Sequence, residues 1–198
     1  MGTNKREGLY RVNLQKLFEI QRILDEKIVK EKGLEGQDLL DKKILALQVE
    51  LGELANEWQM FKFWKEDPKP RRELKRMRSI DGHNYFEEVY KRPLLEEYVD
   101  CLHFILSIGN ELGKHDVDIS CDYTEETITG TFNRTFETIG DLRHAIRNEL
   151  ALEAGEAYEV IFELLVGLGE MLGFTWKEVE QAYYAKNKEN HERQENGY

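Results

Sequence analysis

The three prolines of the chain are confined to one short part of it, at positions 68, 70 and 93. Proline breaks the interior of a helix because it lacks a backbone N–H and clashes with the preceding turn. Apolar residues on both sides of this part recur at three- and four-residue spacings, which indicates amphipathic helices. We predict helices at about 13–32, 38–64, 93–113, 128–140, 142–172 and 175–196. The pattern therefore predicts an all-α fold, a helical bundle.

Composition and charge exclude several classes of protein. The 198 residues hold 28 Lys and Arg against 39 Asp and Glu, a net charge of −11 that disfavours binding to a nucleic-acid polymer. No stretch reaches the roughly 18 apolar residues of a membrane-spanning helix, and the first residues lack the apolar region of a secretory signal. Two cysteines do not make a disulfide framework. We therefore expect a cytoplasmic protein without nucleic-acid or membrane partners.

The length suits one domain, so we treat residues 1–198 as a single domain. A segment rich in Lys and Arg at about 68–92 interrupts the helical pattern as an insertion. A solvated loop is the favoured interpretation of this insertion, with a phosphate-facing flap or a partner-binding arm as the alternative. Residues 114–127 show little helical periodicity, and we expect an irregular linker there with room for a short strand.

Two pairs of acidic residues lie inside apolar helices. Glu50 and Glu53 project about 60° apart on the edge of a leucine stripe, where a solvated pair is the simplest interpretation. Glu97 and Asp100 belong to a helix that is apolar nearly all round, which is typical of a buried helix. No Lys or Arg lies between residues 93 and 113 to pair with them. Burying such carboxylates costs several kcal/mol unless something compensates their charge.

The two acidic pairs would converge if their helices packed antiparallel. A cluster of four carboxylates needs cations, and oxygen ligands select Mg²⁺ or Mn²⁺. A buried network with a Lys or Arg from elsewhere in the chain is the structural alternative. His103 follows Asp100 by three residues, as in di-iron bundles, but those need such a histidine on two helices. We therefore expect His103 to be a hydrogen-bonded neighbour of the site.

The last helix carries Lys186, Asn190 and Arg193 at positions i, i+4 and i+7, which places them on one face. An ammonium, an amide and a guanidinium on one face suit phosphate groups. The alternative is a solvated face with Lys–Glu pairs. Gln21, with Asp25 beside it, interrupts the apolar stripe of the first helix, so its amide bonds either a neighbouring helix or a ligand. Trp64 and Lys65 follow the acidic helix and could stack on a base and touch phosphate, or be ordinary core or surface residues.

Four segments together resemble the dimeric all-α dUTPase family, within the all-α NTP pyrophosphatase (MazG-type) superfamily. They are LFEIQRILDEKI, LALQVELGELANEWQMFKFWK, LLEEYVDCLHFILSIG and AYYAKNKENHERQENGY. The paired E-x-x-E and E-x-x-D motifs are shared by the whole superfamily. The glutamine of the first helix and the C-terminal K-x-x-x-N-x-x-R-Q-x-x-G-Y run are more specific to dUTPases. Some members of the family carry Asn where this chain has Asp25.

The resemblance implies hydrolysis of dUTP, and also of dUDP, to dUMP for nucleotide-pool sanitation, with pyrophosphate released from dUTP. It also implies a homodimer with the substrate pocket near the subunit interface. Two or three Mg²⁺ ions would be bound by Glu50, Glu53, Glu97 and Asp100, and Glu50 would also activate the attacking water. Phosphates would contact Lys186, Asn190 and Arg193, and the nucleoside would contact Gln21, Asp25, Trp64 and His103. The alternatives are a pyrophosphatase acting on dCTP or a modified dNTP, and a non-catalytic helical regulator.

Overall fold

The computed structural model describes residues 14–79, 86–117, 119 and 121–196. In these ranges six helices and one two-stranded sheet are present, which confirms the all-α fold class. The helices are α2 (Leu14–Glu31), α3 (Leu40–Trp58), α4 (Pro93–Leu112), α5 (Ile128–Arg147), α6 (Ala151–Met171) and α7 (Trp176–Glu195). The strands are β1 (Leu74–Ser79) and β2 (Phe86–Lys91).

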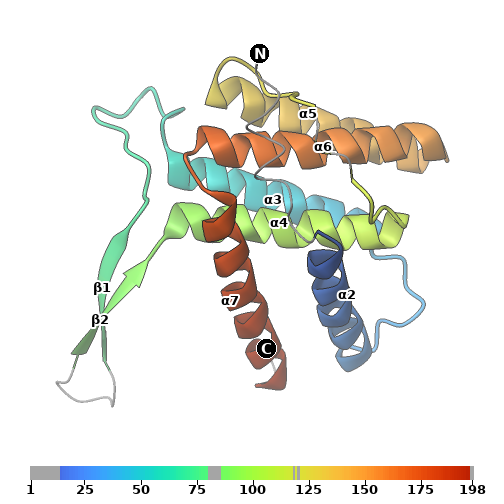
Figure 1. The fold of residues 1–198 in the computed structure, drawn as a ribbon, viewed down its shortest axis with the longest axis horizontal. Coiled ribbons are helices and arrows are strands. Elements are labelled where there is room, and N and C mark those ends of the chain that lie inside the picture. Colours follow the sequence, from blue (N-terminus) through green and yellow to red (C-terminus); the bar gives the residue numbers. More distant parts are fainter. Residues whose placement is uncertain (1–13, 80–85, 118, 120, 197–198) are drawn as a thin grey trace.

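The helix α4 lies at the centre of the bundle and packs against α2, α3, α6 and α7 (Figure 1). Thirteen of its 20 residues are buried, as its apolar residues all round the helix predict. The helices α5 and α6 lie side by side above it, whereas α2 and α7 run crosswise below it. The helices α3 and α4 pack against each other and run in opposite directions.

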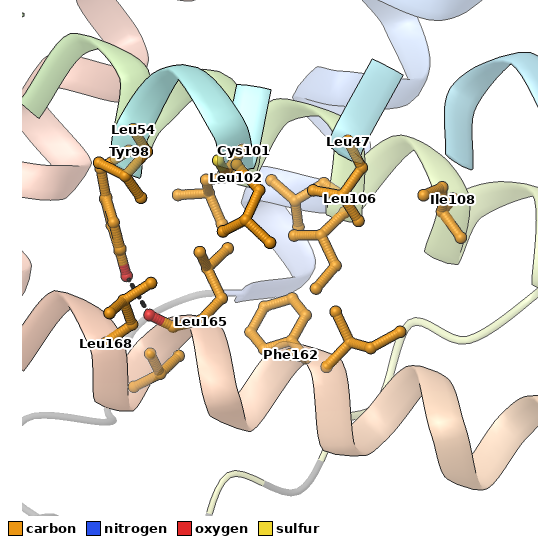
Figure 2. Close-up of a cluster of buried hydrophobic side chains, with 14 of the residues drawn as sticks. Leu47, Leu54, Tyr98, Cys101, Leu102, Leu106, Ile108, Phe162, Leu165 and Leu168 are labelled. Carbon is orange, nitrogen blue, oxygen red and sulfur yellow. Dashed lines mark hydrogen bonds between the residues drawn. The ribbon is translucent and has the colours of Figure 1, made fainter. Parts of the chain in front are cut away.

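Side chains from three helices fill the core between α3, α4 and α6 (Figure 2). Leu54 of α3 and Leu102 of α4 are buried together with Leu165 and Phe162 of α6. The hydroxyl of Tyr98, which is also buried, donates a 2.9 Å hydrogen bond to the Leu165 carbonyl. A core of close-packed leucines on three helices leaves little freedom for α4 to slide or rotate. No helix of the described residues combines the length and apolarity needed to cross a membrane.

The insertion contains a β-hairpin rather than only a loop. β1 and β2 pair antiparallel, with Leu74 opposite Lys91, and the hairpin extends away from the helices (Figure 1). Three arginines tie its base to the bundle. Arg71 Nε lies 2.7 Å from a Glu57 carboxylate oxygen, Arg92 lies 2.8 Å from Glu178, and Arg72 donates to the Leu172 carbonyl at 2.6 Å. Part of the basic character of this segment therefore serves to anchor it.

Two predicted helix limits are wrong. The helix expected to reach residue 64 ends at Trp58, where Gln59 adopts a left-handed conformation (φ 63°) and its N–H bonds the Ala55 carbonyl. The break expected near Gly140 lies instead at residues 148–150, where Glu149 has a φ of 56°. Gly140 is exposed inside the continuous helix α5, and packing of α5 on α6 offsets its low helix propensity. The described part of the linker (114–117, 119 and 121–127) contains no strand.

Candidate functional site

Three of the four predicted acidic ligands converge between α3 and α4. Glu50 of α3 and Glu97 and Asp100 of α4 each place one carboxylate oxygen within 4.8 Å of the others. All three side chains are half-buried. Glu97 and Asp100 lie one helical turn apart, so they project from the same side of α4 toward Glu50. We call these three residues the carboxylate cluster.

Burial and mutual repulsion disfavour the charged forms of these carboxylates. Burial, followed by the charges of Asp100 and Glu53, raises the pKa of both Glu50 and Glu97 to about 7. Burial also raises the pKa of Asp100. Glu53 is exposed, and its charge acts from the rim of the cluster. Such a set of oxygen donors fits a hard divalent metal ion.

A cation from α7 already contacts the carboxylate cluster. Lys186 Nζ donates a 2.6 Å hydrogen bond to Asp100 Oδ2, and both side chains are mostly buried. The lysine charge lowers the pKa of Glu50, Glu97 and Asp100, although burial outweighs it. The sequence left open whether metal ions or a Lys or Arg from elsewhere in the chain compensate the buried carboxylates. Lys186 provides such a cation at Asp100, beside the other carboxylates that could bind metal.

The other two residues of the predicted phosphate-binding face follow Lys186 along α7. Asn190 is half-buried, and Arg193 is exposed and lies 2.6 Å from Glu189. The Arg193 charge lowers the pKa of Asp100, so it acts on the same cluster. Lys186 and Arg193 also line a groove of about 540 Å³ between the end of β2, α4 and α7. The three cluster carboxylates are not among the residues that line this groove, and Lys186, which bonds Asp100, is the residue that connects the groove to the cluster.

A network of hydrogen bonds joins the predicted nucleoside-binding residues where α2, α4 and α7 meet. Gln21 Nε2 donates to Asp25 Oδ1 at 2.8 Å, and Gln21 Oε1 lies 2.7 Å from His103 Nδ1. The Tyr183 hydroxyl donates to the same Gln21 oxygen at 3.0 Å, and the Ser107 hydroxyl donates to Asp25 Oδ2 at 2.6 Å. Gln21, His103, Ser107 and Tyr183 are buried, so the network is largely shielded from water.

His103 is neutral in this environment. Burial, followed by the charge of Lys186, lowers its pKa to about 3. Its ring stacks on Tyr183 with centroids 4.2 Å apart. Its Nε2 atom is buried and has no hydrogen-bond partner within the described residues. The Gln21 amide bonds to neighbouring helices, as one of the two predictions for it states, and the buried His103 Nε2 is a polar atom still able to bond a ligand.

Trp64 and Lys65 lie in the turn after α3. Trp64 is 64% exposed and packs edge-on against Phe61 and Phe63, with ring centroids 5.9 and 5.1 Å away. Lys65 Nζ donates to Gln59 Oε1 at 2.6 Å. Their contacts are within this turn, so their base and phosphate contacts stay predictions.

Sequence reasoning missed three members of the network, namely Lys43, Ser107 and Tyr183. Lys43 Nζ lies 3.4 Å from Asp25 Oδ2. Ser107 follows His103 by four residues, so its place on the same face of α4 was a usable signal. Tyr183 precedes Lys186 by three residues, so it lies on the same face of α7 as Lys186, which was also a usable signal. Lys43 carried no such signal, because only tertiary packing brings α3 next to Asp25.

Comparison with known proteins supports one family. A search of curated proteins finds no match to this chain. A family model described as dUTPase matches residues 13–198, which include the carboxylate cluster, the network around Gln21 and the cationic residues of α7. The match thus covers nearly the whole chain, and the chain belongs to the dUTPase family, whose members hydrolyse dUTP.

Proposed function

We propose that the chain hydrolyses dUTP, and also dUDP, to dUMP with Mg²⁺, releases pyrophosphate from dUTP, and so keeps dUTP out of the nucleotide pool. The observation that carries this proposal is the convergence of Glu50, Glu97 and Asp100 within 4.8 Å beside the Lys186 ammonium. Together they provide oxygen ligands for metal ions and a positive charge for phosphates at one place.

The carboxylate cluster would hold two or three Mg²⁺ ions, or Mn²⁺, with Glu53 joining from the rim. When bound, such ions stabilise negative charge on phosphate oxygens and make water a stronger nucleophile. Glu50 is the residue we assign to the attacking water, because a carboxylate can accept a proton and Glu50 faces the other two carboxylates from the opposite helix. Glu97 and Asp100 would complete the ligand set from the facing helix.

The remaining residues would bind the two ends of the nucleotide. Lys186, Asn190 and Arg193 would neutralise the charge that develops on the departing phosphates, with Lys65 as a further contact. Gln21, Asp25 and His103 would hold the nucleoside, with Trp64 stacking on the base. We further propose a homodimer in which the substrate pocket lies near the subunit interface.

A panel of dNTPs and dUDP with Mg²⁺ tests this proposal. We expect dUTP to be turned over fastest, with dUMP and pyrophosphate as products identified by chromatography, and dUDP to yield dUMP and phosphate. Chelation of the metal should stop turnover. Faster hydrolysis of dCTP or of a modified dNTP would refute the substrate assignment, and a protein that binds dUTP without turnover would be a regulator.

A further inference from the structure

The hydrogen-bond network determines which nitrogen of His103 carries the proton. Asp25 Oδ1 lies 2.8 Å from Gln21 Nε2, and Gln21 Oε1 lies 2.7 Å from His103 Nδ1. A glutamine amide can be placed either way round, and a neutral histidine has two tautomers, so each assignment follows from the bonding partners. The three side chains therefore have to be assigned together.

Asp25 is the member of this series whose role is fixed. As a carboxylate it can only accept hydrogen bonds, so the Gln21 group that faces it must be the NH₂. The Gln21 oxygen then faces His103, and Nδ1 must carry the hydrogen that it accepts. The Tyr183 hydroxyl agrees with this orientation, because it lies 3.0 Å from the same oxygen and donates to it.

Two groups hold Asp25 in place through its other oxygen. The Ser107 hydroxyl donates to Asp25 Oδ2 at 2.6 Å, and Lys43 Nζ lies 3.4 Å from the same atom. The Lys43 ammonium has only N–H donors and requires an oxygen at that position, whereas the Ser107 hydroxyl donates here and is also able to accept. Stacking on Tyr183, with an angle of 21° between the rings, holds the plane of the His103 ring.

The consequence is a buried acceptor without a partner. With the proton on Nδ1, His103 Nε2 has a free lone pair, and no group of the described residues donates to it. His103 is 5% exposed and lies near Lys186, whose charge lowers the pKa of the ring. A buried acceptor without a donor is costly, so a ligand that brings an N–H or O–H is favoured at this place.

We propose that Asp25 is a positioning residue that, through the Gln21 amide, keeps the proton of His103 on Nδ1, so that Nε2 accepts a hydrogen bond from an N–H or O–H of the nucleoside. The contact to the nucleoside rests on the proposed function. The placement of the proton is a property of the free protein and does not depend on it.

The Asp25→Asn variant tests the relay. The Lys43 ammonium has only N–H donors and requires an oxygen at Oδ2, so the new amide places its NH₂ toward Gln21. Gln21 should then turn round and present its NH₂ to His103 Nδ1, which moves the proton to Nε2. We expect ¹⁵N NMR of histidine-labelled protein to show His103 protonated on Nδ1 in the unmodified chain and largely on Nε2 in Asp25→Asn.

The matched control is Glu111→Gln. Glu111 also contacts Lys43, at 2.6 Å, but has no contact with Gln21, so the control makes the same chemical change beside the same lysine. It should leave the His103 proton on Nδ1. The relay is overturned by protonation on Nε2 in the unmodified chain, by an unchanged tautomer in Asp25→Asn, or by an equal shift in Glu111→Gln.

Steady-state kinetics test the contact with the nucleoside. With an N–H in place of the acceptor, Asp25→Asn should raise the KM for dUTP about tenfold relative to Glu111→Gln, with kcat within about twofold, because the carboxylate cluster is untouched. A KM equal to that of Glu111→Gln would overturn this contact. Absence of dUTP turnover in the unmodified chain would instead refute the proposed function, and the NMR result would still stand.

Two nucleotide analogues identify the donor. Methylation of N3 of the base removes one candidate, and removal of the 3′-hydroxyl removes the other. The analogue that lacks the true donor should bind about tenfold more weakly to the unmodified chain and show no further loss with Asp25→Asn. If both analogues lose a further tenfold in Asp25→Asn, the nucleoside does not donate to Nε2 and the proposed contact is overturned.

Discussion

Burial favours the neutral form of both an acidic and a basic side chain on the helix α4, namely Glu97 and His103. On α4 it raises the pKa of Glu97 to about 7 and lowers the pKa of His103 to about 3. Glu97 is half-buried and His103 is buried, and their pKa values move in opposite directions because a carboxyl group becomes charged by losing a proton and an imidazole by gaining one. The site therefore presents carboxylates that need a cation next to an imidazole that stays neutral.

The role proposed for Glu50 leads to a first prediction. Glu50→Gln should lower kcat for dUTP at least about 100-fold, because an amide cannot accept the proton of the attacking water. The free energy of unfolding of the metal-free variant at pH 8 should not fall, since one of the repelling charges is removed. Steady-state kinetics and urea titration measure the two quantities.

The control for this prediction is Glu156→Gln. Glu156 belongs to a second E-x-x-E run, Glu153 to Glu156, and is exposed on α6. Its removal should leave kcat unchanged. Unchanged turnover in Glu50→Gln itself would exclude Glu50 from the chemistry.

At the scale of elements, close approach of helices holds α4 in place. Gly109 lies where α4 meets Tyr158 of α6 and Phe18 of α2, and a Cβ atom there would overlap both rings. Gly140 of α5 has no such role, since a Cβ atom there would meet nothing within 4 Å. Packing therefore distinguishes two glycines that both lie inside helices.

Alanine at these two glycines should change stability in opposite directions. Gly109→Ala should lower the free energy of unfolding by about 1–3 kcal/mol, because Tyr158 or Phe18 must move. Gly140→Ala should raise it by about 0.5–1 kcal/mol, because alanine favours the helix. Urea unfolding followed by circular dichroism measures both, and equal effects in the two variants would contradict this packing.

Element limits were predictable where local chemistry sets them. The start of α4 at Pro93 and the cap of α7 at Thr175, whose side chain accepts from the Glu178 N–H, follow from residue types near the helix end. The end of α3 at Trp58 was not predictable, because Gln59 carries no local signal for a left-handed conformation. The hairpin was missed because the strand Leu74–Ser79 is mostly polar and lacks an apolar face.

For the whole molecule, the carboxylate cluster links stability to pH and to metal. Glu50 and Glu97 have pKa values raised from 4.5 to about 7 in the folded chain, so the folded state binds protons more tightly than the unfolded state. Their contribution to stability is complete below pH 4.5 and is lost as the pH rises through about 7. Above that range, Lys186 compensates only part of the negative charge.

Mg²⁺ should therefore stabilise the protein more at high pH than at low pH. At pH 8, Mg²⁺ at about 100 times its dissociation constant should raise the Tm by about 5–10 °C. At pH 5 the increase should be much smaller, because protons occupy the same carboxylates. Calorimetry of the protein with and without Mg²⁺ measures the difference, which Glu50→Gln should reduce. An equal increase at both pH values would place the metal elsewhere.

Periodicity and the confinement of proline were enough to predict an all-α bundle, because the spacing of apolar residues depends only on helix geometry. The two acidic pairs were predictable for a similar reason, since a carboxylate inside an apolar helix stands out along the chain. Tertiary structure alone decided that Glu53 stays at the rim, that Lys186 pairs with Asp100, and that Asp25 reaches His103 through Gln21. The pairing of Lys186 with Asp100 and the contact of Gln21 with His103 join residues of different helices. The distances between helices are set by the packing of side chains from distant parts of the chain, and periodicity along one helix does not contain this information.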